Sequence, residues 1–277
     1  MIKLVAIDLD GTLLSGAKTI SEKNQTVLAQ AKAQGVKIVL CTGRPLTAIT
    51  PFLECLHLRE AGDYSITFNG GLVQKNDTGE IVRKHTLTLA DVQTLLAVAK
   101  ELKMPMDILS DEVVLSFATS TYQTIYPQLN PLLTFVATRE DELTTQRLYN
   151  KAVIAYHQDK LAEWIPAIPT AIKEQFEVIK TRSNLLEFMP KGVTKASGIA
   201  LLAEELGLVP AEIMAIGDEE NDLSMIEYAG IGVAMANATA EVKRSADVVT
   251  TSNEEDGVAQ AILNYVLSVR SESDGLF

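Results

Sequence analysis

The stretch KLVAIDLDGTLL, residues 3–14, decides how this sequence is interpreted. Residues 3–7 form a short, mostly apolar run that is typical of a buried strand, and Asp8 and Asp10 follow it directly. Side chains two positions apart on a strand point to the same side, so the two carboxylates are expected to repel each other where burial is most costly. Such a pair needs a cation, or a proton on one member. The sequence therefore predicts a functional site at the end of the first strand.

Short apolar runs alternate with amphipathic segments on either side of a middle block. Strands are expected at residues 36–41, 64–68, 213–216, 231–235 and 246–250. One helix is expected between Ser21, which can cap it, and Gly35, and further helices at residues 195–206, closed by Gly207, and 223–229. Residues 72–84 are interpreted as a hairpin that turns at 76–79. This alternation predicts βαβ units, and hence an α/β fold with a doubly wound parallel sheet.

The middle block, residues 83–186, has the pattern of an α+β unit. Helices are expected at residues 90–102 and 160–172, with Trp164 in the core, and residues 106–109 are expected to pair with 113–117. Strands that pair with their neighbours in sequence are antiparallel. We therefore expect a discontinuous core of residues 1–82 and 187–277, interrupted by an inserted α+β domain, and a frayed tail from Arg270 onward.

The composition argues against several classes of function. The 277 residues carry a formal net charge of −12, which disfavours nucleic acid and anionic membranes as partners. Because the sequence has neither a run of about 18 apolar residues nor a signal-peptide pattern, we expect a soluble, cytoplasmic protein with no membrane partner. Two cysteines make no disulfide framework, and Cys41 is interpreted as a small buried apolar residue. The sequence makes no prediction about oligomeric state.

Polar residues also follow three other strands of the expected sheet. Thr42-Gly43-Arg44 follows the second strand, Asn69-Gly70-Gly71 the third, and the segment GDEEND, residues 217–222, a later one. In open α/β sheets, ligands bind outside the carboxyl ends of the strands. These residues are therefore expected to converge on one crevice with Asp8 and Asp10.

The residue types in this crevice favour phosphoryl transfer. Three or four carboxylates without His or Cys form a hard oxygen-ligand set, which suits Mg²⁺. Thr42 and Gly43 offer a hydroxyl and an open N–H to phosphoryl oxygens, and Lys195 offers a mobile cation. Each feature alone has an ordinary interpretation, such as a turn for Asp-x-Asp, a helix cap for Gly-Asp and a surface lysine for Lys195. Their joint occurrence at strand ends and helix starts favours a site instead.

These motifs match a known family. Asp8-x-Asp10-Gly11-Thr12, Thr42-Gly43-Arg44, Lys195 and Gly217-Asp218-x-x-Asn221-Asp222 resemble the four motifs of the haloacid dehalogenase (HAD) superfamily of phosphatases. The insertion and the segment PKGVTK, residues 190–195, resemble the Cof-type branch, which carries a class IIB cap. Similarity to a sugar phosphatase of that branch extends through nearly the whole core and is weaker in the cap. The resemblance implies a Rossmann-like, HAD-like core and a cap that closes over the crevice and selects the leaving group.

The resemblance also implies roles for the acidic residues. Asp8 is expected to be the nucleophile that forms an aspartyl phosphate. Asp10 is expected to act as general acid and then as general base, with its backbone carbonyl in the metal shell. Asp8 and Asp218 are expected to bind Mg²⁺ through their carboxylates. Asp222 is expected to support that shell or to orient Lys195.

The other motif residues are expected to bind the phosphoryl group or the substrate. The resemblance implies that Thr42 and Gly43 hold the phosphoryl group, that Lys195 neutralises its charge and that Asn221 donates a hydrogen bond to it. Arg44 is expected either to contribute to this binding or to pair with a carboxylate of the core.

The predicted function is a Mg²⁺-dependent phosphatase that hydrolyses small phosphomonoesters, with sugar phosphates as the substrate class implied by the resemblance. Three alternatives stay open, in decreasing order: a phosphomutase on the same scaffold, a catalytically silent phosphate-binding protein and a signalling receiver domain. A receiver domain is a compact single unit whose phosphorylated aspartate ends a later strand, whereas Asp8 ends the first one.

Overall fold

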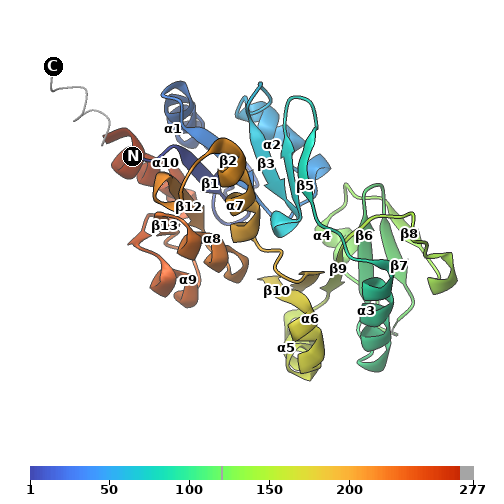
Figure 1. Cartoon of the computed structure of the whole chain (residues 1–277). Coiled ribbons are helices and arrows are strands. Elements are labelled where there is room, and N and C mark those ends of the chain that lie inside the picture. Colours follow the sequence, from blue (N-terminus) through green and yellow to red (C-terminus); the bar gives the residue numbers. More distant parts are fainter. Residues whose placement is uncertain (120, 269–277) are drawn as a thin grey trace, which may run out of the picture. The chain divides into compact units, whose positions relative to one another are not determined.

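The computed structural model describes residues 1–119 and 121–268, in which the chain forms two compact units (Figure 1). Unit 1 comprises Met1–Lys84 and the chain from Thr194 onward, and unit 2 comprises His85–Val193. Unit 2 begins and ends later than the insertion expected at residues 83–186. The expected second boundary falls inside β11 (Leu185–Pro190), which pairs with β10 (Phe176–Arg182) along its whole length. The tail expected to fray from Arg270 lies outside the described residues.

Unit 1 contains an eight-stranded sheet in the order β14-β13-β12-β1-β2-β3-β4-β5. The strands from β14 to β3 are parallel, and β4 and β5 run antiparallel at one edge. The prediction of a doubly wound parallel sheet is confirmed. The strands are β1 (Leu4–Ile7), β2 (Lys37–Cys41), β3 (Tyr64–Thr67), β4 (Leu72–Lys75), β5 (Ile81–Lys84), β12 (Ile213–Gly217), β13 (Ile231–Ala234) and β14 (Val248–Val249).

Helices cover both faces of this sheet because its central strands are apolar on both sides. Along β1, Val5 and Ile7 pack into one buried cluster with α1 and α10, whereas Leu4 and Ala6 pack into another with α7. The alternation of side chains along a strand produces these two layers. The helices are α1 (Glu22–Ala33), α2 (Thr50–Cys55), α7 (Lys195–Leu206), α8 (Leu223–Tyr228), α9 (Ala240–Ser245) and α10 (Gly257–Ile262).

The helix ends of unit 1 follow the expected capping signals. Ser21 Oγ accepts the backbone N–H of Asn24 at 3.1 Å and so caps α1. Gly207 ends α7 in the left-handed conformation, with a φ of 64°. Within the described residues, every helix is too short or too polar to cross a membrane.

The strand order of unit 1 reverses at β1. The chain runs outward from β1 through β2 to β3, and it later returns to β12 on the other side of β1. At such a reversal the loops after neighbouring strands leave toward opposite faces of the sheet, and a crevice opens outside the carboxyl ends. The loops that follow β1, β2 and β12 are therefore expected to carry the site.

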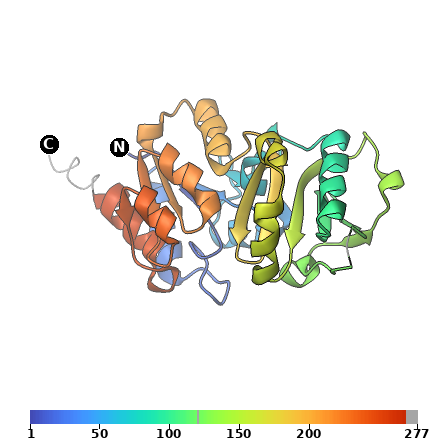
Figure 2. The same cartoon turned by 90° about the horizontal axis from the view of Figure 1, so that it is seen from below.

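Unit 2 is an α+β unit in which three helices, α3, α5 and α6, cover one face of the sheet (Figure 2). The sheet has the order β10-β11-β9-β6-β7-β8, and all neighbours are antiparallel except β7 and β8. Side chains of α3, α5 and α6 share a buried cluster with this sheet. The remaining elements are β6 (Met106–Ser110), β7 (Val114–Phe117), β8 (Phe135–Ala137), β9 (Tyr149–Ala155), α3 (Leu89–Glu101), α4 (Tyr126–Leu129), α5 (Gln158–Ala167) and α6 (Thr170–Gln175).

The helical stretch expected at residues 160–172 is helical except for a break at residues 168–169. Two helices occupy this segment, because α5 ends at Ala167 and α6 begins at Thr170. A proline disfavours the helical conformation in the residue before it, and Ile168, which precedes Pro169, is extended with φ −63° and ψ 123°. The apolar pattern nevertheless continues across the break, since Trp164 and Ile172 both lie in the core.

Candidate active site

Lys195 lies at the centre of a buried ionic cluster in unit 1. It is the first residue of α7, its side chain is 0% exposed, and its Nζ lies 2.5 Å from Asp8 Oδ1 and 2.5 Å from Asp222 Oδ1. Asp8 directly follows β1, and Asp222 ends the short turn η5 (Glu220–Asp222) after β12. This burial excludes the surface position that Lys195 taken alone would suggest, and it agrees with the expectation that Lys195 belongs to the site. The cation expected to be mobile is held between two carboxylates.

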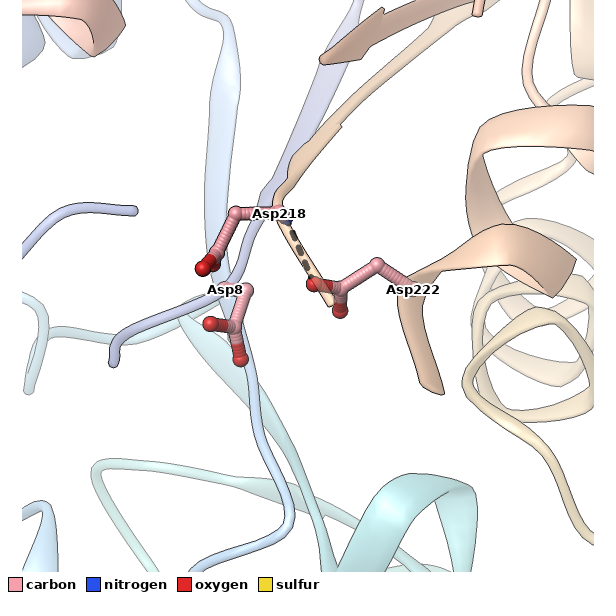
Figure 3. A group of neighbouring side chains, drawn as sticks. All are labelled: Asp8, Asp218 and Asp222. Carbon is pink, nitrogen blue, oxygen red and sulfur yellow. Dashed lines mark hydrogen bonds between the residues drawn. The ribbon is translucent and has the colours of Figure 1, made fainter. Parts of the chain in front are cut away.

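Asp218 forms a group of three carboxylates with Asp8 and Asp222 (Figure 3), and one oxygen from each lies within 4.8 Å of the other two. Thr12 Oγ1 donates to Asp218 Oδ1 at 2.6 Å. The backbone N–H groups of Asp218 and Glu219 donate to Asp222 Oδ2 at 2.8 and 3.0 Å. Both oxygens of Asp222 are thus engaged. Among the described residues, no hydrogen bond reaches the second oxygen of Asp8 or of Asp218.

The ionisation of these carboxyl groups is unfavourable in the folded chain. Burial raises the pKa of Asp8 from 3.8 to about 7, although Lys195 partly lowers it. Burial also raises the pKa of Asp218 from 3.8 to about 8, and the charges of Asp8 and Asp222 raise it further. Burial alone would lower the pKa of Lys195, but the carboxylates of Asp222 and Asp8 raise it above its ordinary value. Three carboxylates beside one ammonium leave the cluster short of positive charge.

The donor set of this cluster fits a hard divalent cation. All its candidate ligands are carboxylate oxygens, which Mg²⁺ prefers to nitrogen or sulfur. Space beside Asp218 is preserved by Gly11, where an added Cβ would lie only 2.3 Å from Asp218 Oδ2. The backbone of Gly11 is also left-handed, with a φ of 85°, which a glycine adopts without strain.

Asp10 lies in a different ionic contact. Arg44 donates from Nε to Asp10 Oδ2 at 2.7 Å and from Nη2 to Oδ1 at 2.6 Å, and Lys18 Nζ donates to Oδ1 at 2.7 Å. The guanidinium of Arg44 also lies 5.6 Å from the ring centroid of Phe52. Of the two roles expected for Arg44, the structure shows the pairing with a carboxylate of the core. Residues from two separate loops therefore orient the side chain of Asp10.

The loops after β2, β3 and β12 meet at Asn69. The backbone N–H of Asn69 donates to the carbonyl of Thr42 at 3.0 Å, and Asn221 Nδ2 donates to Asn69 Oδ1 at 3.1 Å. A Cβ on Gly43 would lie 3.0 Å from Asn69 Oδ1, so the two residues are in close contact. Thr42, Gly43 and Asn221 are thus brought together. Thr42 Oγ1 accepts the backbone N–H of Arg44 at 3.2 Å.

Asn69 was expected to lie at the crevice but was assigned no role there, and Lys18 was not among the residues expected to form the site. Asn69 is fully buried and left-handed, with a φ of 53°. Its place in Asn-Gly-Gly at a strand end was a signal, because asparagine tolerates this conformation in turns. Lys18 lies in a polar loop whose sequence carries no comparable signal.

Cys41, the last residue of β2, is confirmed as a small buried apolar residue. Its side chain is 0% exposed. Burial raises the pKa of its thiol to about 12, so the reactive thiolate does not form near neutral pH.

Known proteins resemble this chain over nearly its full length. The family model of haloacid dehalogenase-like hydrolases matches residues 5–262. YxeH of Bacillus subtilis, which carries the provisional name of a phosphatase, is 39% identical over 269 residues, or 97% of this chain and 100% of YxeH. YcsE of the same organism, named a 5-amino-6-(5-phospho-D-ribitylamino)uracil phosphatase, is 32% identical over 266 residues and 96% of each chain.

A solved structure gives the same result for the fold. The HAD subclass IIB sugar phosphatase BT4131 superposes with a TM-score of 0.79 at 26% identity, covering 95% of this chain and 98% of that one. Because both units lie within the superposed length, the likeness extends to the insertion. The chain therefore belongs to the haloacid dehalogenase-like hydrolases, and within them to the Cof-type phosphatases that carry a class IIB cap.

Proposed function

We propose that this chain hydrolyses small phosphomonoesters in a Mg²⁺-dependent reaction. The observation that carries the proposal is the shortage of positive charge where three carboxylates surround one buried lysine. Asp8 and Asp218 would hold the cation through the oxygens that lack a hydrogen bond to described residues, with the backbone carbonyl of Asp10 as a further ligand. When bound, Mg²⁺ would supply positive charge to the oxygens of the transferring phosphoryl group.

The proposed reaction has two steps. In the first, a carboxylate oxygen of Asp8 attacks phosphorus, the bond to the leaving oxygen breaks, and Asp10 donates a proton to that oxygen. In the second, water attacks phosphorus, the bond between phosphorus and the Asp8 oxygen breaks, and Asp10 takes up a proton from this water. Inorganic phosphate is released and the carboxylate of Asp8 is regenerated. Both carboxyl groups return to their starting state, so the atoms and charges balance over one turnover.

Neighbouring residues would bind the phosphoryl group and hold the nucleophile. Thr42, Gly43 and Asn221 lie together beside Asn69 and offer hydroxyl, backbone and amide donors. Lys195 contacts Asp8 and would neutralise charge on the phosphoryl group. Asp222 would act as a positioning residue, because one of its oxygens binds Lys195 and the other binds two N–H groups of the loop after β12.

Sugar phosphates and related phosphorylated metabolites are the proposed substrates. BT4131 is named a sugar phosphatase, and the named substrate of YcsE carries its phosphate on a ribityl chain. The net charge of −12 also supports a small metabolite over nucleic acid as partner. The location proposed for this activity is the cytoplasm. Unit 2 would select the leaving group, as the cap does in the proposed class of enzyme.

Phosphate release from a panel of phosphorylated metabolites and 4-nitrophenyl phosphate, with and without Mg²⁺, tests the proposal. We expect Mg²⁺-dependent release by the wild-type chain and a loss of about 1000-fold or more in Asp8→Asn, which removes the nucleophile. The matched control is Asp63→Asn, since Asp63 is also buried and pairs with a lysine, Lys32 Nζ, at 2.8 Å. This control lies outside the cluster and should keep its activity.

Two outcomes would contradict the proposal. A wild-type chain that releases no phosphate from any member of the panel in the presence of Mg²⁺ would not be a phosphatase of this class. Conversion of one sugar phosphate into an isomer without free phosphate would identify a phosphomutase instead.

A further inference from the structure

Lys18 lies in a loop that is built and anchored within unit 1. The loop closes through backbone hydrogen bonds, from Ser15 N–H to the carbonyl of Thr19 at 3.0 Å and from Lys18 N–H to the carbonyl of Ser15 at 2.9 Å. The backbone N–H of Gly16 donates to Glu254 Oε1 at 2.6 Å, which ties the loop to the segment before α10. The position of the Lys18 backbone is therefore set by contacts that do not involve its own side chain.

The backbone of Lys18 is left-handed, with a φ of 60°. L-residues with a Cβ adopt this conformation at a cost, and turns usually place Gly, Asn or Asp there. Unlike glycine, lysine has a Cβ, and unlike Asn and Asp it has no short polar side chain that can hydrogen-bond to its own backbone. The loop thus carries a lysine at a position where local preference favours another residue.

Stability does not explain this choice of residue. The contact between Lys18 Nζ and Asp10 Oδ1 joins a side chain that is 55% exposed to one that is 17% exposed. Ion pairs of this kind contribute little to the free energy of unfolding, so the contact does not offset the strained backbone. Backbone strain beside a site is typical of residues that are retained for function.

We propose that Lys18 is a positioning residue for Asp10, an inference that rests on the proposed function. In that reaction Asp10 must deliver a proton to the leaving oxygen and later accept one from water, and both transfers require a fixed carboxyl group. Arg44 holds both oxygens of Asp10 from the loop after β2. Lys18 adds a third hydrogen bond, from a separate loop, and so limits rotation of the Asp10 carboxyl group about its Cβ–Cγ bond.

Replacement of Lys18 by glycine separates positioning from stability. Lys18→Gly removes the ammonium and also relieves the left-handed strain, so its midpoint of thermal unfolding should stay equal or rise. We expect kcat/KM to fall about tenfold or more for a sugar phosphate, whose poor leaving group depends on the proton from Asp10. For 4-nitrophenyl phosphate, whose leaving group departs without a proton, the fall should stay below about twofold. Lys18→Arg restores a cation and should recover most of the loss.

The matched control is Lys103→Gly, because Lys103 is also exposed and left-handed, with a φ of 55°, and lies in unit 2. Lys103→Gly should leave kcat/KM unchanged for both the sugar phosphate and 4-nitrophenyl phosphate. An equal loss of kcat/KM on both substrates, an unchanged value on both, or a lowered unfolding midpoint in Lys18→Gly would overturn the positioning role while the wild-type chain remains active. A wild-type chain without Mg²⁺-dependent phosphate release would instead overturn the proposed function, and the inference with it.

Discussion

The Asp8→Asn replacement should stabilise unit 1 at neutral pH when no divalent cation is present. The pKa of Asp8 is about 7 in the folded chain against an ordinary 3.8, because its carboxyl group is buried. At a pH between these two pKa values, Asp8 keeps its proton in the folded chain and has released it in the unfolded chain. The stability of the wild-type chain therefore falls as the pH rises from about 4 to about 7, and the loss is complete above that range. Asparagine carries no charge and removes this loss.

The size of the effect follows from the same pKa. At about 1.4 kcal/mol for each pH unit, a group whose folded pKa is about 7 lowers the free energy of unfolding by about 3 kcal/mol between about pH 5 and pH 7. Asp8→Asn should escape this loss. The pKa of Asp218, about 8, is raised in part by the charge of Asp8, so the replacement lessens its contribution in the same direction.

Urea unfolding at several pH values in EDTA measures this difference. Hydrogen exchange in peptides from β1 and β12 reports on unit 1, and the fluorescence of Trp164, the single tryptophan of the chain, reports on unit 2 as an internal control. Mg²⁺ favours the ionised carboxylates, and it should therefore flatten the pH dependence of the wild-type chain. Parallel stability curves for the wild-type and Asp8→Asn chains between about pH 5 and pH 8 would refute the reasoning.

Two further replacements test single contacts. Gly11→Ala should weaken Mg²⁺ binding and lower kcat/KM in a Mg²⁺ titration, because its Cβ would lie 2.3 Å from Asp218 Oδ2. Gly79→Ala is the control for backbone strain, since Gly79 has a φ of 73° and open space around its Cβ, and it should keep full activity. Lys151→Met should destabilise unit 2 by about 3–5 kcal/mol, because it removes the ammonium that lies 2.5 Å from the buried carboxylate of Glu187. Adding Glu187→Leu should restore much of that loss in urea unfolding followed by Trp164 fluorescence, and a double variant no more stable than Lys151→Met would contradict this account.

The parts of the fold that depend on local pattern were predictable. The β1 strand is apolar on both sides and is followed at once by polar residues, which indicates a buried strand of a doubly wound sheet. Ser21 and Gly207 mark helix ends through hydrogen bonding and backbone conformation that are properties of the residues themselves. The break before α6 was equally local, since Pro169 specifies it, but the continuous apolar pattern of the segment favoured one helix.

The residue types of the site were predictable from the sequence, but the contacts between its charged side chains were not. Carboxylates at Asp8 and Asp218 together with Lys195 indicate phosphoryl chemistry wherever they meet. Which carboxylate each cation contacts depends on loop conformations that spacing along the chain does not determine. Arg44 and Lys18 both bind Asp10, although one lies 34 positions and the other 8 positions away in the chain. The burial of Lys195 likewise follows from how α7 is placed against β1, a property of the assembled sheet.

The central pairing of unit 1 also sets an order of events during synthesis. β1 pairs with β12, with Leu4 opposite Ile213, so the first strand made waits for one of the last. The strands of unit 2 are contiguous between His85 and Val193, and unit 2 can therefore fold on the ribosome while unit 1 still lacks three of the eight strands of its sheet. Asp218 directly follows β12, so Asp8 meets it only when that late strand docks. A nascent chain that has not yet formed β12 therefore does not bring the carboxylates of Asp8 and Asp218 together, and their mutual repulsion arises only after β12 has paired with β1.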